Sequence, residues 1–384
     1  MSAREQPIKH SALYVGAMTG TSLDGLDLAL LELGEPDAGG KPKLHISEGQ
    51  TLPLPAALRA ELAALTLPGE NEIERLGRAD RRLGEFIGTS VLSYLTGLGL
   101  TAADIRAIGS HGQTIRHRPD ADAPFTLQIG DPNCIAEVSG IDTVADFRRR
   151  DVAAGGQGAP LVPLFHRALF NSQLAEQQAQ VAVLNIGGIS NLSLLGDDSS
   201  VLGFDCGPGN GLMDAWIARH KQLDFDENGA WASSGQADGV LLEQLLADPY
   251  FSQAPPKSTG REYFSLSWLQ GFARVAQLQP EQVQATLAEL TARSVGQSIA
   301  DYGDSPAQLF VCGGGRLNRH LLRRLRALCP MPVHSTEDVG INGDSLEAAA
   351  FAWLAHRTIE GLAGSAPSVT GAKGSRVLGA IFPG

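Results

Sequence analysis

The distribution of apolar residues predicts the same local structure twice in this chain. An apolar run at residues 13–18 and an alternation at residues 26–30 predict two strands, separated by a turn of small residues. Residues 181–186 and 192–194 repeat this arrangement around a second small-residue turn. The chain is therefore expected to contain two strand-turn-strand units, one in each half.

Helical periodicity accounts for much of the remaining sequence. In chain order, the further elements predicted are a helical stretch at 54–100, a strand at 105–108, a helix at 286–299, a strand at 308–312 and a basic amphipathic helix at 318–328. A third glycine turn, Gly313-Gly314-Gly315, follows the strand at 308–312. A last helix begins near Asp344, whose carboxylate is expected to cap it while Glu347 closes a capping box.

Length and composition favour a two-domain cytoplasmic protein. The chain has 384 residues, more than a core of roughly 100 to 200 residues needs, and the glycine-rich stretch 153–160 marks a domain boundary. A formal net charge of -12 argues against binding to nucleic acid. The four cysteines show no CxxC spacing, so the sequence predicts neither a zinc site nor a disulfide framework. No apolar stretch reaches the roughly 18 residues of a membrane span.

The first small-residue turn has the chemistry of a phosphate-binding loop. Gly20, Thr21, Ser22 and Gly25 are small, so their backbone amides can approach an anion closely. Asp24 in the same turn is a candidate carboxylate ligand for Mg²⁺. A purely structural tight turn is the alternative for either turn alone, but two turns in matching positions favour nucleotide binding. The sequence contains neither GxxxxGK[ST] nor a strand that runs into GxGxxG.

Asp205 is the candidate general base. It follows a predicted strand at 201–204 and precedes a Gly/Pro turn, so its carboxylate is expected at the carboxyl edge of a sheet, where α/β proteins bind ligands. Phosphoryl transfer to a hydroxyl uses a carboxylate of this kind. The structural alternative is an Asp that caps the helix through Leu212 and Trp216.

Two further positions suggest contacts with a polar substrate. His111 follows the strand at 105–108, and without a Cys or metal partner it is either a hydrogen-bond donor to substrate or a packed structural histidine. In the run 148–150, Arg150 lies nearest the glycine boundary and is the candidate to bind a carboxylate, although such a run is usually a solvated face with one member engaged. The polar segment 257–261 either closes over the substrate or forms an ordinary surface loop.

Five segments carry the most specific signal. They are Gly16-Ala17-Met18-Thr19-Gly20-Thr21-Ser22-Leu23-Asp24-Gly25, Ser110-His111-Gly112-Gln113-Thr114, Asn185-Ile186-Gly187-Gly188, Phe204-Asp205-Cys206-Gly207-Pro208-Gly209-Asn210 and Val311-Cys312-Gly313-Gly314-Gly315. These strings resemble the anhydro-N-acetylmuramic acid kinase family over nearly the whole chain. More broadly, the glycine turns are similar to the nucleotide core shared by actin, sugar kinases and heat-shock chaperone ATPases, although a shared fold does not establish function.

The resemblance implies a fold and an activity. The fold would be a two-domain α/β actin-like ATPase (sugar kinase) fold, with duplicated ribonuclease H-like cores and a nucleotide cleft between them. The N-terminal domain would comprise residues 11–145 plus 355–384, and the C-terminal domain residues 146–354. The activity would be a step of peptidoglycan recycling and amino-sugar catabolism. In it, 1,6-anhydro-N-acetylmuramic acid is opened with water and phosphorylated on O6 with ATP and Mg²⁺.

The resemblance also assigns residues. The family's base falls on Asp205, and its sugar contacts fall on Arg150, opposite the lactyl carboxylate, and on Glu347. Its nucleotide contacts fall on Gly20, Thr21, Ser22, Leu23, Asp24, Gly25, Leu26, Asp27, Gly187, Gly188, Gly313, Gly314 and Gly315.

The expected partner is a small-molecule substrate, with no nucleic acid, no membrane and, as one option, a second copy of the chain in a homodimer. Two other functions remain open from the sequence. One is a kinase for an ordinary free sugar on the same fold, and the other is a non-enzymatic actin-like or chaperone ATPase.

Overall fold

The first of two β-sheets is built mainly from the N-terminal third of the chain. The computed structural model describes residues 12–20, 23, 25–36, 42–47, 49–177, 179–196 and 201–384. The strands of this sheet are β1 (Ala12–Thr19), β2 (Gly25–Pro36), β3 (Pro42–Ile46), β4 (Gln50–Pro53), β5 (Ile105–Arg118), β6 (Phe125–Ile129), β7 (Thr143–Ala145) and β13 (Ala380–Phe382). Its main path runs β13-β7-β5-β1-β2-β3, with β4 beside β2 and β6 beside β5.

The second sheet repeats this topology. Its strands are β8 (Val181–Ile186), β9 (Ile189–Leu195), β10 (Val201–Pro208), β11 (Gln308–Cys312) and β12 (Val333–Ser335), in the order β10-β9-β8-β11-β12. In the first sheet β2 pairs antiparallel with both β1 and β3, and β1 pairs parallel with β5. In the second sheet β9 pairs antiparallel with both β8 and β10, and β8 pairs parallel with β11. The predicted α/β fold with duplicated ribonuclease H-like cores is thereby confirmed.

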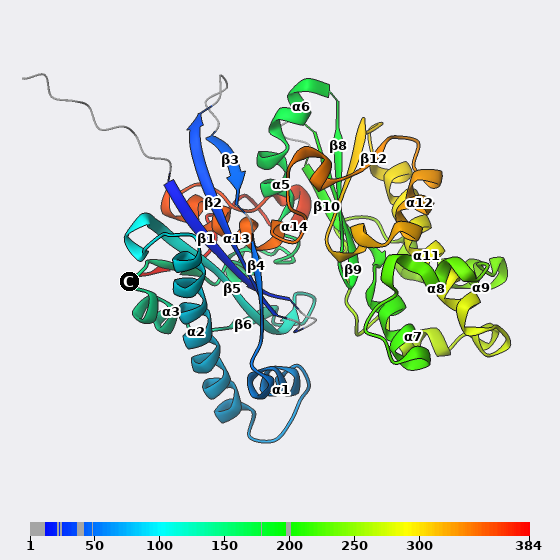
Figure 1. Ribbon diagram of the computed structural model, residues 1–384, viewed down its shortest axis with the longest axis horizontal. Helices are drawn as coiled ribbons and strands as arrows, with labels where there is room; N and C mark the ends of the chain where they lie inside the picture. Colours follow the sequence, from blue (N-terminus) through cyan, green and yellow to red (C-terminus); the bar gives the residue numbers. More distant parts are fainter. Residues whose placement is uncertain are drawn as a thin grey trace, which may run out of the picture.

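Helices surround the two sheets and also lie between them. They are α1 (Ala56–Leu65), α2 (Glu72–Gly97), α3 (Pro132–Ser139), α4 (Arg149–Ala153), α5 (Pro163–Leu169), α6 (Asn171–Gln177), α7 (Gly211–Lys221), α8 (Ala230–Ser234), α9 (Gly239–Leu246), α10 (Leu266–Gln270), α11 (Pro280–Tyr302), α12 (Arg319–Leu328), α13 (Leu346–Ile359) and α14 (Pro367–Thr370). Figure 1 shows the blue and cyan first sheet on the left, the green and yellow second sheet on the right, and α5 and α14 between them. In the described part of the chain, no helix is both long and apolar enough to cross a membrane.

The predicted elements are found, but two strands extend past their predicted ends at the site. The strand predicted at 201–204 continues to Pro208 as β10, so Asp205 lies inside a strand and not just past its carboxyl end. The strand predicted at 105–108 extends to Arg118 as β5, so His111 lies inside a strand and not beyond its end. The helical stretch predicted at 54–100 consists of two helices, α1 and α2. The basic helix predicted after the third glycine turn is α12, and the side chain of Asn318 caps its N-terminus.

Helix α13 packs between two lobes, the first built on the first sheet and the second built on the second sheet. It contacts β1, β2 and β5, and its residues belong to a buried cluster that takes Tyr14 from the first sheet and Val183 and Phe310 from the second. The predicted domain limit between residues 354 and 355 falls inside this helix. Strand β13 pairs with β7 and so returns the end of the chain to the first sheet. The exact residue limits of the two domains stay predictions.

Two glycines allow α13 to lie directly on the first sheet. Gly16 on β1 and Gly109 on β5 are register partners. A Cβ at Gly16 would come within 1.7 Å of the Ala348 carbonyl oxygen, and one at Gly109 within 2.0 Å of the Phe351 carbonyl oxygen. Both obstacles are helix backbone, which cannot rotate away as a side chain can, so the two positions require glycine.

Gly109→Ala should destabilise the protein by about 2–3 kcal/mol or more, because the added methyl must push α13 off the sheet. Gly77→Ala is the matched control, since Gly77 lies within α2 and a Cβ there would meet no atom within 4 Å. That change should stabilise by about 0.5–1 kcal/mol through helix propensity. Urea unfolding midpoints measure both effects, and equal midpoints for the two variants would contradict the packing argument.

Candidate functional site

The first glycine turn closes the hairpin of β1 and β2. Leu23 has a φ of +59° and donates its amide N–H to the carbonyl of Gly20 at 3.1 Å. Gly25, Leu26 and Asp27 of the predicted ATP segment begin β2. Outside the described residues lie Thr21, Ser22 and Asp24. Their contacts with nucleotide, and the metal-ligand role of Asp24, stay predictions.

The second glycine turn, between β8 and β9, is held by the turn that follows β10. The Gly188 carbonyl accepts hydrogen bonds from the amides of Gly209 and Gly211 at 3.0 and 3.1 Å, and the Gly187 carbonyl accepts one from Asn210 at 2.7 Å. Backbone groups alone make these contacts. The strand that carries the candidate base is therefore connected directly to the predicted phosphate turn.

The third glycine turn packs against the end of β8. Gly313 has a φ of +71°, and a Cβ there would lie 2.2 Å from Oδ1 of Asn185. A Cβ at Gly315 would lie 2.3 Å from Cγ2 of Ile186. By contrast, the nearest atom to a Cβ on Gly314 would be 3.7 Å away, so that side of the turn is open. This combination of a packed side and an open side suits a backbone that a nucleotide must approach closely.

Asp205 lies within β10 and is held by two donors. Its Oδ1 accepts a hydrogen bond from Nδ2 of Asn191 at 2.5 Å, and its Oδ2 accepts one from the amide of Thr259 at 2.9 Å. The register between β10 and β9 is irregular between Asp205 and Gly207, and such bulges often re-aim side chains beside active sites. Helix α7 has Asn210 at its N-cap position, so the alternative in which Asp205 caps that helix is wrong.

The surroundings of Asp205 tune its acidity. Burial raises the pKa of Asp205 to about 6, and the Thr259 amide, the Asn191 side chain and the Lys257 ammonium act in the opposite direction. A carboxylate with a pKa near 6 is mostly ionised at neutral pH and is basic enough to accept a proton. Asp205 therefore has the properties of a general base.

Glu347 lies in the first turn of α13 without capping it. Its Oε1 accepts a hydrogen bond from Nδ2 of Asn185 at 3.0 Å, across the two lobes. Asp344, the other half of the expected capping box, instead accepts two hydrogen bonds from the Arg316 guanidinium at 2.7 Å each, and Ser345 is the N-cap residue. The capping-box prediction is wrong, because both carboxylates have tertiary partners that local spacing does not reveal.

The surroundings of Glu347 raise the pKa of its carboxyl group. Burial is the largest cause that raises its pKa, and the nearby carboxylate of Asp27 raises it further. The Arg148 guanidinium and the Asn185 amide act against this increase. Glu347 and Asp27 belong to different elements of the first lobe, so the two carboxylates mark one acidic region of the site.

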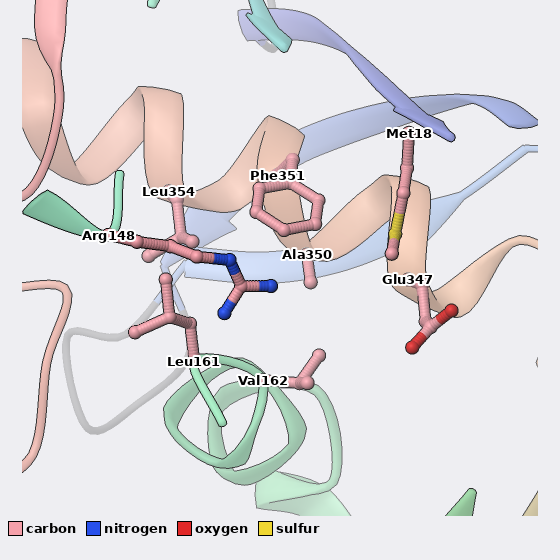
Figure 2. A pocket seen from close by; sticks show the side chains of 8 residues that line it. All are labelled: Met18, Arg148, Leu161, Val162, Glu347, Ala350, Phe351 and Leu354. Atoms are coloured by element: carbon pink, nitrogen blue, oxygen red, sulfur yellow. The ribbon is translucent and has the colours of Figure 1, made fainter. Parts of the chain in front are cut away.

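Arg148 and Glu347 line one pocket. Its other lining residues are apolar: Met18, Leu161, Val162, Ala350, Phe351 and Leu354. Figure 2 shows the Arg148 guanidinium pointing into the space between Phe351 and Val162, with the Glu347 carboxylate farther along. The pocket thus brings one cation and one carboxylate together among apolar walls, in a cavity of about 30 Å³.

His111 is buried beneath this pocket. Its Nε2 accepts a hydrogen bond from Nε of Arg148 at 3.0 Å, so its Nδ1 donates to the Gly112 carbonyl at 2.8 Å. Its ring contacts Phe351 at a centroid distance of 4.6 Å, and burial lowers its pKa well below the usual value. Both nitrogens have partners within the protein, as in the packed alternative. Direct substrate binding by His111 would require one of these bonds to break.

The structure separates the members of the arginine run. Arg150 lies in α4 and is exposed, whereas Arg148 is partly buried and reaches the pocket. The contact of Arg150 with a substrate carboxylate stays a prediction, and Arg148 becomes a second candidate for it.

Sequence reasoning missed Asn191, Thr259 and Arg148. Asn191 had a weak signal, because Asn is depleted in strands and this one lies within β9. Thr259 acts through its backbone amide, for which residue type carries no signal. Arg148 belongs to the arginine run 148–150 that the sequence singled out. Only its packing against residues of α13 shows that it is the arginine that lines the pocket.

Comparison with known proteins identifies close relatives. The chain is 52% identical over 374 residues to the anhydro-N-acetylmuramic acid kinase of Pseudomonas putida, covering 97% of this chain and 99% of that protein. It is 49% identical over 374 residues to that of Coxiella burnetii, covering 97% of each. An activator of 2-hydroxyisocaproyl-CoA dehydratase from Clostridium difficile, solved with bound ADPNP, covers 91% of this chain and 97% of its own at 14% identity. Its TM-score of 0.42 is too low to inform the site.

A family model gives the same result over nearly the full length. The model described as anhydro-N-acetylmuramic acid kinase matches residues 12–384, which include both sheets, the described glycine turns and Asp205. Together with relatives near 50% identity, this match shows that the chain belongs to the anhydro-N-acetylmuramic acid kinase family.

Proposed function

We propose that this protein hydrolytically opens 1,6-anhydro-N-acetylmuramic acid and phosphorylates O6 with ATP, giving N-acetylmuramic acid 6-phosphate and ADP in cytoplasmic peptidoglycan recycling. The observation that carries the proposal is the carboxylate of Asp205. It is fixed by two hydrogen-bond donors, has a pKa raised to about 6, and lies on the strand that is tied to the second glycine turn. Family membership supplies the substrate class, and the site supplies a base beside a phosphate turn.

In the proposed reaction, Asp205 accepts a proton from a water molecule that attacks the anomeric carbon. The bond between C1 and the bridging oxygen breaks, and its electron pair stays on O6. That oxygen attacks the γ-phosphoryl group of ATP, and ADP leaves. Holding water, sugar and nucleotide in one cleft makes these steps effectively intramolecular, which is a large source of rate acceleration.

The glycine turns would hold the nucleotide. Charge that spreads over the phosphoryl oxygens would be met by backbone amides of the turns at Gly20 and at Gly187-Gly188, and the open side of Gly314 would face the nucleoside. Mg²⁺ would neutralise part of the phosphate charge, and Asp24 is its proposed ligand. Positioning and electrostatics of this kind supply most of the catalysis in phosphoryl transfer.

The small pocket beside Glu347, about 30 Å³ in volume, is proposed to hold one end of the sugar. A partly buried arginine binds a carboxylate strongly through charge-assisted hydrogen bonds. Nε of Arg148 donates to His111 at 3.0 Å and Nη1 donates to the Gly158 carbonyl at 2.7 Å, which orients the guanidinium so that Nη2 is the nitrogen proposed to meet the carboxylate. Burial lowers the pKa of Arg148 only to about 10, so the side chain remains a cation at neutral pH. The lactyl carboxylate would therefore meet Arg148 or, as the sequence suggested, Arg150.

Turnover in ¹⁸O-labelled water tests the proposed reaction. Mass spectrometry should find one ¹⁸O atom at C1 of the phosphorylated product, because water opens the bridge while O6 stays on the sugar. Free N-acetylmuramic acid should accept phosphate far more slowly, which separates the enzyme from a kinase for an ordinary sugar. Unlabelled product, or ATP hydrolysis that ignores the sugar, would reject the proposal.

The acidic limb of the rate profile should report Asp205. As the pH falls below about 6 the base becomes protonated, so kcat/KM should decline about tenfold per pH unit. Asn191→Leu removes a donor that lowers this pKa, so the limb should move to higher pH. Asn133→Leu, which changes an exposed residue of α3, should leave the limb in place.

Asp205→Asn should abolish turnover while ATP binding, measured by calorimetry, stays close to that of the wild type. If the acidic side of the pH profile of kcat/KM has the same apparent pKa in Asn191→Leu as in the wild type, or if Asp205→Asn turns over normally, Asp205 is not the base.

Paired arginine variants decide which residue binds the lactyl group. If Arg148 binds it, Arg148→Gln should lower kcat/KM by about 10- to 10²-fold, since a charge-assisted hydrogen bond contributes about 1.5–3 kcal/mol. Arg150→Gln should then change kcat/KM less than about twofold, because the side chain is exposed. Steady-state kinetics with the anhydro sugar measure both variants. The reverse ranking would assign the contact to Arg150, as the sequence predicted.

A further inference from the structure

The segment Lys257-Ser258-Thr259-Gly260-Arg261, here called the strap, lies along the candidate base. The Asp205 amide donates to the Lys257 carbonyl at 3.3 Å, and the Thr259 amide donates to Oδ2 of Asp205 at 2.9 Å. These two contacts hold the strap beside β10. The segment is therefore part of the site and not a remote surface loop.

The first end of the strap is anchored in the protein. Lys257 is only 7% exposed, and its ammonium lies 5.0 Å from the ring centroid of Tyr250 and 5.8 Å from that of Phe204. The Tyr250 hydroxyl in turn donates to the Asp205 carbonyl at 2.8 Å. A cation packed between aromatic rings and a hydrogen-bonded tyrosine fix this end relative to the base.

The other end of the strap reaches the second glycine turn. A Cβ built on Gly188 would lie 3.0 Å from Cδ, 3.4 Å from Cγ and 3.8 Å from Nε of Arg261, so the arginine stem crosses this glycine. Arg261 is exposed, and within the described ranges no hydrogen bond or ion pair involves its guanidinium. An unpaired guanidinium thus lies next to the turn at which phosphate is proposed to bind.

We propose that Arg261 is a further catalytic residue, whose guanidinium binds the transferring phosphoryl group of the triphosphate at the second glycine turn. This inference rests on the proposed function. Arginine is suited to the task because its fork matches phosphate oxygens and keeps its charge at any physiological pH. In other phosphoryl-transfer enzymes, an arginine supplied by the same chain stabilises the charge of the transition state.

The strap also explains why one segment could serve both chemical steps. Its Thr259 amide holds the oxygen of the base, and Arg261, two residues later, lies over the phosphate turn. Phosphate bound to Arg261 would fix the last residue of the strap, two positions after Thr259, which contacts the base. Proton abstraction and phosphoryl transfer would then be aligned by five consecutive residues.

Arg261→Gln tests the assignment with two independent measurements. The kcat for ADP formation with the anhydro sugar should fall by at least about 10³-fold, which is the lower range for loss of such an arginine. Calorimetry should show that affinity for a non-hydrolysable ATP analogue falls much more than affinity for ADP. Arg261→Lys, which keeps the charge and loses the fork, should lie between the wild type and Gln. Arg319→Gln, an exposed arginine at the start of α12, should match the wild type in both measurements.

Two outcomes distinguish the failure of this inference from that of the proposed function. Wild-type kcat and an unchanged ratio of triphosphate to diphosphate affinity in Arg261→Gln would overturn the role of Arg261 alone. If the wild type does not phosphorylate the anhydro sugar, the proposed function fails, and the affinity ratio still decides whether Arg261 reads the terminal phosphate. Because Arg261 is exposed, thermal midpoints of the Gln and Lys variants should equal that of the wild type.

Discussion

The backbone contact between α13 and the first sheet is the constraint on which the site depends. Only glycine at 16 and 109 lets the helix approach so closely, and the carbonyl that Gly16 faces belongs to Ala348, the neighbour of Glu347. The carbonyl that Gly109 faces belongs to Phe351, whose ring packs on His111. Glu347 and the floor of the pocket are thus placed by main-chain packing, which holds position better than long side chains on loops would.

Burial then sets the charges that this geometry brings together. A pKa of about 6 leaves roughly nine in ten Asp205 side chains ionised at pH 7, and a pKa of about 10 leaves roughly one in a thousand Arg148 side chains neutral. An ionised Asp205 carboxylate and a cationic Arg148 guanidinium can therefore exist in the protein at the same pH. Burial shifts both values toward the neutral form, and the polar partners of each residue limit the shift.

The parts of this structure that follow from local chemistry were predictable. Strands around 13–18 and 181–186 and their glycine turns follow from short-range patterns. The start of the strand that carries Asp205 does too, but not its continuation through Asp205 to Pro208. The errors concern residues whose role depends on distant packing. Asp344 and Glu347 have the spacing of a capping box, but a buried Arg316 and a strand Asn185 outcompete the helix end for their carboxylates. Such competition is decided in three dimensions, so spacing along a helix cannot reveal it.

The pairing of strands in the second sheet connects the two candidate carboxylates to one another. Asp205, Asn191 and Asn185 are register partners across β10, β9 and β8. Asn191 donates to Asp205, and Asn185 donates to Glu347 of the first lobe. One hairpin therefore holds both carboxylates through its two asparagines, and its turn is Gly187-Gly188.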